Sequence, residues 1–276
     1  MSQFDLHSHS TCSDGLLKPR ELIARAAQRG VATLALTDHD DVSGLAEARA
    51  AAAQQGIALI NGVEISVTWN SHTLHVVGLH VDPENDELAT GLRQIRSGRR
   101  RRAEAMASSL EQAGIAGSLE GARAHAGNPE LVGRTHFARF LVEHGHARDL
   151  QSVFRKYLTG DKPGHVPHQW ASLEQAVGWI RVSGGMPVLA HPGRYKLDNT
   201  QREALLTQFK DLGGAGVEVV TGSHTAQQFT SWGRYARHYG LLASVGSDFH
   251  GPGESYRDLG ELPALPAGCV PVWEQW

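Results

Sequence analysis

Short apolar runs alternate with longer helical stretches along most of this chain. Aliphatic and β-branched residues gather at positions 4–7, 31–37, 57–64, 73–79, 186–190, 216–221 and 241–246. Runs of this length, bounded by glycine and polar residues, are typical of buried strands. The stretches between many of them are amphipathic or rich in alanine. This alternation predicts βα units around a parallel sheet, and therefore an α/β fold.

Proline, capping residues and glycine mark where the helices begin and end. Pro19 opens a helix that Gly30 stops. Ser43 is expected to cap a second helix, which Gly56 closes. Two later helices are expected at 202–212 and 225–239.

The segment from Glu87 to Leu158 has a different character. It shows helical periodicity and polar loops but no convincing strand, and six arginines fall between Arg93 and Arg102. With 276 residues, 41% of them hydrophobic, the chain suits one large domain that carries an insertion. We therefore predict an all-helical insertion, or substrate cap, at 87–158 on a domain built from 1–86 and 159–276.

Charge and cysteine content narrow the function classes. A formal net charge of −3 gives no whole-surface attraction to nucleic acid or anionic lipid, so a polyanion must meet a local patch. Cys12 and Cys269 form neither a close zinc-binding pair nor a disulfide framework. No segment has the length of a signal-peptide core or a membrane span. We expect a cytoplasmic protein without membrane association.

Metal-binding residue types recur at the predicted strands. The motifs are Asp-Leu-His-Ser-His at 5–9, Thr-Asp-His-Asp at 37–40, Gly-Val-Glu at 62–64, Leu-His-Val-Val-Gly at 74–78, Ala-His-Pro-Gly at 190–193 and Gly-Ser-Asp-Phe-His at 246–250. Loops at the carboxyl ends of parallel strands meet on one face. Residues two apart on a strand point to one side, so His7 with His9, and Asp248 with His250, can face one cavity.

The chemistry of this set favours divalent metals. Imidazole and carboxylate ligands without thiolate suit Mn²⁺, Fe²⁺ or Zn²⁺. Asp14, Glu64 and Asp248 would repel one another at close range unless cations neutralised them. A single histidine is more often a core or surface residue, so the prediction depends on the whole set. His72 or His80 could replace His75 as a ligand, although alternation points His75 inward with Val77.

Six sequence blocks occur in the order found in a known family: DLHSHSTCSDG, LALTDHD, NGVEIS, HTLHVVGLH, VLAHPGRY and SVGSDFH. Nearly the whole chain thus resembles the PHP (polymerase and histidinol phosphatase) metal-dependent phosphoesterases. The resemblance implies a distorted seven-stranded βα barrel with three metals. It implies one metal at His7, His9, Glu64 and Asp248, a second at Glu64, His75 and His191, and a third at Asp14, His39 and His250.

Within the family, the chain looks most like members that hydrolyse the 3′-phosphate of 3′,5′-nucleotide bisphosphates, converting pAp to AMP and phosphate. These members are also linked to removal of 5′-mononucleotides from short RNA. The insertion with its RTHFAR segment points there, and Asp14 stands where histidinol phosphatases commonly place a histidine. The expected nucleophile is a hydroxide held by the metals, manganese first and iron or zinc as alternatives, with no separate catalytic side chain assigned.

Two other functions remain open from the sequence. One is another phosphatase activity of the family, such as histidinol-phosphate hydrolysis. The other is a noncatalytic, metal-stabilised module that binds nucleic acid, for which RNA affinity would survive metal removal. The complete ligand set favours catalysis. The resemblance implies a small nucleotide, or short single-stranded RNA, as the substrate, and no protein partner is implied.

The insertion supplies the candidate substrate contacts. Arg99 and Arg102 lie one helical turn apart and can grip one phosphate, although an arginine run also fits a solvated helix face. Arg134 lies at the expected start of a helix, where an anion is favoured, and is predicted to clamp phosphate. His136 fits a phosphate contact and a capping or packing role equally well.

Weaker candidates lie in the segment that returns from the insertion and beyond it. Lys162, His165 and His168 belong to a polar stretch that could reach over the site. His224 follows a strand at the correct end, although a surface-loop position is the preferred interpretation. Three tryptophans are expected in the core or at an interface: Trp170, Trp179 and Trp232.

Overall fold

The computed structural model describes residues 3–276, and its centre is a barrel of seven strands. The strands are β1 (Phe4–Asp5), β2 (Thr33–Leu36), β3 (Ala58–Trp69), β4 (His72–Leu79), β5 (Met186–Leu189), β6 (Gly216–Thr221) and β7 (Leu242–Gly246). They pair in sequence order. Leu6 N donates to Val245 O and Asp248 N donates to His7 O, each over 2.9 Å, so the ends of the sheet nearly close. The predicted seven-stranded α/β barrel is confirmed.

One strand runs against the predicted direction. β1, β2 and β3 are parallel, as are β5, β6 and β7, but β4 is antiparallel to both of its neighbours. The fully parallel sheet was therefore a wrong prediction. β3 continues to Trp69, and the turn residues Asn70 and Ser71 have φ of 44° and 66°. A two-residue turn of this conformation reverses the chain directly into a hairpin, with no helix to carry it back.

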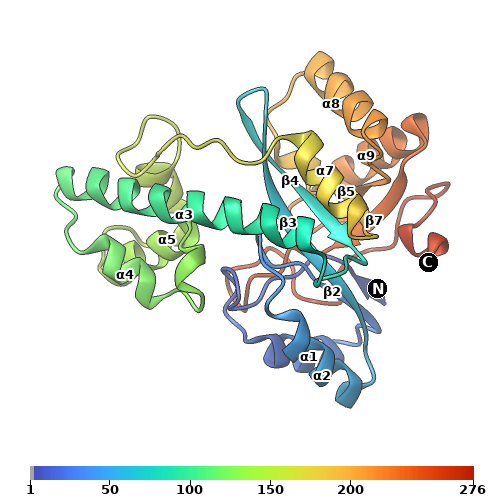
Figure 1. Ribbon diagram of the computed structural model, residues 1–276, viewed down its shortest axis with the longest axis horizontal. Helices are drawn as coiled ribbons and strands as arrows, with labels where there is room; N and C mark the ends of the chain where they lie inside the picture. The colour runs from blue at the N-terminus through green and yellow to red at the C-terminus, as the bar shows by residue number, and fades with distance from the viewer. Residues whose placement is uncertain (1–2) are drawn as a thin grey trace.

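Helices cover the barrel on several sides (Figure 1). They are α1 (Pro19–Gln28), α2 (Leu45–Gln55), α7 (Leu173–Val182), α8 (Asn199–Asp211) and α9 (Ala226–Tyr239), with short turns η3 (Pro192–Arg194) and η4 (Val272–Gln275). The first two pack on a cluster that includes Leu22 and Leu34, and the other three helices pack on a larger one that includes Val177 and Phe209. These clusters fix the strands, and hence the residues at their ends.

The predicted cap of the second helix is wrong. α2 begins after Gly44, which makes no side-chain cap, and the backbone N–H of Ser43 instead donates to Asp41 Oδ1 over 2.7 Å. The Ser43 hydroxyl is therefore not the group that starts the helix. In the described part of the chain, no helix is long and apolar enough to cross a membrane.

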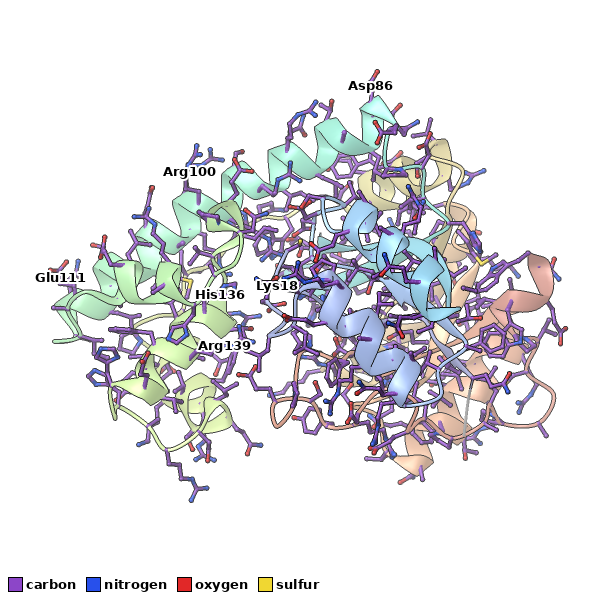
Figure 2. The ribbon with its side chains drawn as sticks, turned by 90° about the horizontal axis from the view of Figure 1, so that it is seen from below. Lys18, Asp86, Arg100, Glu111, His136 and Arg139 are labelled. Carbon is purple, nitrogen blue, oxygen red and sulfur yellow. The ribbon has the colours of Figure 1, made fainter. Side chains whose placement is uncertain are left out.

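Residues 87–158, called the cap below, contain helices and turns but no strand. The elements here are α3 (Asp86–Gln112), α4 (Ser118–Ala124), η1 (Pro129–Leu131), α5 (Arg134–Glu143), α6 (Leu150–Val153) and the π-helical turn η2 (Phe154–Leu158). Figures 1 and 2 show α3 running from Asp86 over the barrel to Glu111 at the far end of the cap.

α3 belongs to two hydrophobic clusters. Leu88, Leu92 and Ile95 pack in the main barrel cluster, whereas Met106 and Leu110 pack in a second cluster inside the cap. The first turns of this helix are therefore part of the barrel's packing. The division at residue 87 stays a prediction.

Candidate metal centre and substrate cavity

Four side chains converge at one end of the barrel. His7 Nε2 lies 3.1 Å from His9 Nε2, 3.3 Å from Glu64 Oε2 and 3.5 Å from Asp248 Oδ1. His9 Nε2 lies 3.3 and 3.4 Å from the same two oxygens. All four atoms lie within 4.8 Å of one another, which makes them a possible set of ligands for one cation. These are the four residues expected around the first metal.

Glu64 lies between this group and a second one. Its Oε2 is 2.9 Å from His39 Nδ1, and its Oε1 is 2.8 Å from both His75 Nδ1 and His191 Nε2. A position shared by both oxygens agrees with the bridging role expected for Glu64. The geometry groups His39 with Glu64 and His75, whereas the sequence prediction had assigned His39 to the third metal only.

The third group contains Asp14 and His250 together with His39 and His9. His250 Nε2 lies 3.3 Å and His39 Nε2 3.8 Å from Asp14 Oδ1. The structure therefore brings all nine predicted ligands together. The grouping of the ligands differs from the prediction, because His9 and His39 each belong to two groups.

The groups fit divalent cations. Glu64 Oε2 and Asp14 Oδ1 are buried, and neither has a hydrogen-bond partner within residues 3–276. Such an oxygen is costly to bury unless a cation or donor meets it. Burial raises the pKa of Glu64, but His75, His7 and His39 outweigh it and hold that pKa well below its usual range. An ionised carboxylate surrounded by imidazole nitrogens is suited to Mn²⁺, Fe²⁺ or Zn²⁺.

Glu218 supports this centre, and the sequence analysis missed it. It is 1% exposed; its Oε1 accepts from His7 Nδ1 over 2.7 Å, and its Oε2 accepts from the backbone N–H of His191 over 2.5 Å. With Nδ1 protonated, His7 keeps the lone pair of Nε2 toward the ligand group. The signal that could have found it is a lone glutamate inside the apolar run Gly-Val-Glu-Val-Val-Thr.

The reversed strand explains which of three neighbouring histidines enters the site. His75 pairs with Ser66 across the hairpin and lies in the first half of β4. His80 lies beyond the other end of β4, where its ring packs edge-on against Trp276 at 4.6 Å between centroids. His72 lies at the first residue of β4 and lines a groove outside the ligand groups. This geometry supports His75, rather than His72 or His80, as the candidate ligand.

A cavity of about 130 Å³ lies over the ligand groups, between the barrel and the cap. Seven of the nine ligands line one side of it. The lining also includes three arginines of the cap, one arginine of the barrel part and two aromatic rings: Arg99, Arg102, Arg134, Arg194, Phe154 and Trp170. Cations therefore face the metal centre across a small space.

Arg99 is bound to the barrel. Its Nε and Nη2 both donate to Asp40 Oδ2, over 2.7 and 2.5 Å, and Nη2 also donates to Ser66 Oγ over 2.7 Å. Asp40 is fully buried and needs this cation. Most donors of Arg99 are thus occupied within the protein, which departs from its predicted role as half of a phosphate clamp.

Arg102 and Arg134 have more donors available. Arg102 makes one hydrogen bond, from Nε to Val166 O over 3.1 Å, and burial, Arg134 and Arg99 lower its pKa to about 9. The guanidinium of Arg134 has no hydrogen-bond partner among the described residues. Burial lowers the pKa of Arg134, and the like charges of Arg194 and Arg99 lower it further. Both arginines are therefore placed for an anion that the protein itself does not supply.

Further contacts hold the cap against the metal centre. Thr135 Oγ1 donates to Asp14 Oδ2 over 2.9 Å, and Arg139 Nη2 donates to the backbone oxygen of Asp14 over 2.7 Å. Outside the cap, in the barrel part of the chain, Arg194 Nη1 donates to Asp248 Oδ2 over 2.9 Å. The sequence analysis missed these three residues, because each depends on a partner at least 54 positions away.

His136 lies outside the cavity lining and is fully buried in the cap. The backbone N–H of Gly133 donates to His136 Nδ1 over 3.0 Å at the start of α5. This contact supports the capping interpretation over the phosphate contact. His224, expected on a surface loop, is instead 3% exposed, and its Nε2 accepts from the backbone N–H of Gly193 over 2.8 Å.

The three candidates in the segment that returns from the cap have different surroundings. His168 packs edge-on against Trp170 at 4.2 Å, and His165 lines a groove next to the cavity. Lys162 is exposed and lies 3.3 Å from Asp161. Of the three tryptophans expected in the core or at an interface, Trp232 is buried in the main barrel cluster, and Trp170 and Trp179 pack partly buried against it. Trp170 also lines the cavity.

The chain is similar to known proteins over nearly its whole length and nearly all of theirs. It is 55% identical to the 3′,5′-nucleoside bisphosphate phosphatase of Chromobacterium violaceum, a match that covers 100% of this chain and 96% of the relative. It is 44% identical to the 5′-3′ exoribonuclease Rnm of Escherichia coli, covering 99% and 93%.

Solved structures agree with this result. A crystal structure of an amidohydrolase from Chromobacterium violaceum, with sulfate bound and no metal, superposes with a TM-score of 0.96 at 54% identity and covers 99% of this chain and 95% of its own. A candidate metal-dependent phosphoesterase from Bifidobacterium adolescentis gives a TM-score of 0.81 at 26% identity, covering 98% and 92%. The PHP domain family matches residues 5–221. The barrel, the converging ligands and these matches together show that this chain belongs to the PHP domain family.

Proposed function

We propose that this chain is a metal-dependent hydrolase that removes the 3′-phosphate from nucleoside 3′,5′-bisphosphates such as pAp. The observation that carries the proposal is the arginine-lined cavity of about 130 Å³ that faces nine converging metal ligands. The similarity to a 3′,5′-nucleoside bisphosphate phosphatase over the whole chain supports the substrate class. We propose three divalent ions per chain, with manganese as the expected metal.

In this proposal, barrel residues would hold the metals and keep them in position. The nine ligands are His7, His9, Asp14, His39, Glu64, His75, His191, Asp248 and His250. Bound divalent metals lower the pKa of water to about 7 and so supply a nucleophile near neutral pH. Glu218 fixes the ring of His7, and Arg194 fixes the carboxylate of Asp248. These contacts remove the need to reorganise ligands during the reaction.

The cap residues bind the phosphate. Arg134 and Arg102 have donors that face the cavity and no acidic partner, so they can neutralise charge on the phosphoryl oxygens. Arg99 keeps the cap at this distance through its buried pair with Asp40. The guanidinium groups of Arg99 and Arg102 also lie over the ring of Trp170, at 4.7 and 5.4 Å, which holds both side chains near the cavity.

Release of inorganic phosphate from pAp by the purified protein with Mn²⁺ tests this function. We expect AMP and phosphate in equal amounts, and little phosphate from histidinol phosphate under the same conditions. Elemental analysis would count the bound metals. Protein that carries metal but leaves pAp intact would contradict the proposal, as would full activity of Asp14→Ala in excess metal.

A second activity is supported by the similarity to a 5′-3′ exoribonuclease over 99% of this chain. Removal of a 5′-terminal nucleotide from RNA breaks the same kind of bond, between the 3′-oxygen and phosphorus. We therefore propose that short 5′-phosphorylated RNA is also a substrate. Stepwise release of mononucleotides from a trinucleotide would support this, and an intact trinucleotide in the presence of active enzyme would limit the protein to free nucleotides.

We also propose a cytoplasmic location. Cys12 and Cys269 are both free in the described chain, which fits a reducing compartment. Fractionation of cells that express the protein would check this, and recovery in the periplasmic or membrane fraction would contradict it.

A further inference from the structure

A groove of about 450 Å³ adjoins the catalytic cavity. Thr73, Arg134 and Arg194 line both spaces, so the groove continues directly from the cavity. Its walls are the turn between β3 and β4, the segment that follows η2, and the segment that follows η3. A space of this size holds a ligand on the scale of a nucleotide.

The groove carries positive charge without negative charge. Lys196, His165 and His72 line it beside the two shared arginines, and none of the described residues in its lining is acidic. Lys196 is exposed and forms no ion pair within residues 3–276. The chain as a whole has a net charge of −3, so this surface is a local departure from the average. A positive groove of this kind is suited to a phosphate backbone.

The two ends of the combined space differ. At the end beneath α3, Ser66 and Arg99 are buried, and the bond between them closes the wall. At the groove end, Thr159, Gly160 and Lys196 are exposed. A ligand that reaches the metal centre can therefore extend outward along the groove.

We propose that the groove holds the RNA strand on the 3′ side of the phosphate that is hydrolysed, with Lys196 and His165 near the next phosphate. This inference rests on the exoribonuclease activity proposed above. The 5′-terminal nucleotide then lies on the side of the metal centre away from the groove, which explains digestion from the 5′ end. Water adds its oxygen to phosphorus and the bond from phosphorus to the 3′-oxygen breaks. The released nucleotide takes the proton on its 3′-hydroxyl, and the shortened RNA keeps a 5′-phosphate. With pAp, the groove stays free.

The charge reversal Lys196→Glu tests this assignment with pAp and a 5′-phosphorylated RNA hexanucleotide as substrates. We expect KM for the hexanucleotide to rise about five- to tenfold, with kcat/KM for pAp within about twofold of wild type. Lys162→Glu is the matched control, because Lys162 is exposed and lies two residues from Gly160 in the chain but does not line the groove. It should leave both substrates near wild type.

Binding of the hexanucleotide with Ca²⁺ in place of Mn²⁺, measured by fluorescence anisotropy, gives a second readout. The slope of log K against log salt should fall by about 1 in Lys196→Glu. An equal loss on pAp and RNA would overturn the proposal and make the groove part of the nucleotide site, and unchanged RNA kinetics and binding would also overturn it. If wild type cleaves neither substrate, the proposed function fails, while the binding measurement still decides the groove.

Discussion

On the barrel side of the cavity, polar side chains hold one another, whereas on the cap side two arginines keep donors without a partner. Glu218 fixes His7 over 2.7 Å, and Asp38 accepts from Ser13 Oγ over 2.6 Å beside His9. Across the cavity, Arg102 has a single backbone acceptor, and Arg134 has none among the residues that the structure describes. The barrel side is thus preorganised for cations that stay, and the cap side retains donors for an anion that comes and goes.

The largest expected effect comes from the barrel side. Glu64→Gln removes the charge shared by two ligand groups, so we expect kcat/KM for pAp to fall by more than about a thousandfold and the metal content to drop. Phosphate release and elemental analysis measure the two effects, with circular dichroism as the check on folding. A variant that keeps its metals and its activity would show that Glu64 is not a ligand.

Arg99 belongs to the cap but is bound to the barrel, so its substitution tests whether this side chain serves stability or substrate binding. Arg99→Ala leaves the buried Asp40 without its cation, and we expect the free energy of unfolding to fall by about 3–5 kcal/mol. Urea unfolding measures this. Combining Arg99→Ala with Asp40→Asn should recover part of the loss. An unchanged stability with reduced phosphate binding would move Arg99 to the substrate side.

Arg134→Ala should act on catalysis alone. We expect kcat/KM for pAp to fall by about a hundredfold, because one donor to the phosphoryl group is lost. Metal content and stability should stay near wild type. Arg100→Ala is the matched control, since Arg100 is exposed and points away from the cavity on the outer face of α3 (Figure 2). Equal loss in both variants would mean that only overall charge matters.

Glu218→Gln should give the smallest of these effects. The amide keeps an acceptor for His7 but loses the charge, so we expect metal affinity to fall by about tenfold. Titration with Mn²⁺ measures this, and high Mn²⁺ should restore phosphate release. Activity that no metal concentration restores would give Glu218 a role beyond holding His7.

Local sequence predicted the barrel and named nine side chains that the structure brings together, because strand ends and side-chain alternation are set by a few neighbouring residues. His7 and His9 share a side by their spacing alone, and they also share a ligand group. The reversal of β4 was not predictable from that pattern. It depends on the turn at Asn70 and Ser71, where asparagine often adopts a positive φ but serine does not.

Long-range contacts account for most of what the sequence analysis missed. The partner of His7 is Glu218, 211 positions away, and the partner of Arg99 is Asp40, 59 positions away. Nothing local in the arginine run separates Arg99, which is bound to a carboxylate, from Arg102, which is not. The distinction depends on the position of α3 across the barrel, which brings Arg99 to Asp40.

The length of α3 also limits which mutations the protein can tolerate. The helix is one continuous rod of 27 residues, and Ile95 packs in the barrel while Ala103 packs in the cap. One residue added between them would turn the cap by about 100° around the helix axis and swing Arg134 away from the metals. Substitutions on the exposed face of this stretch are tolerable, whereas insertions and deletions are not. Relatives that share the activity should therefore keep the count of residues between these two positions even where their side chains differ.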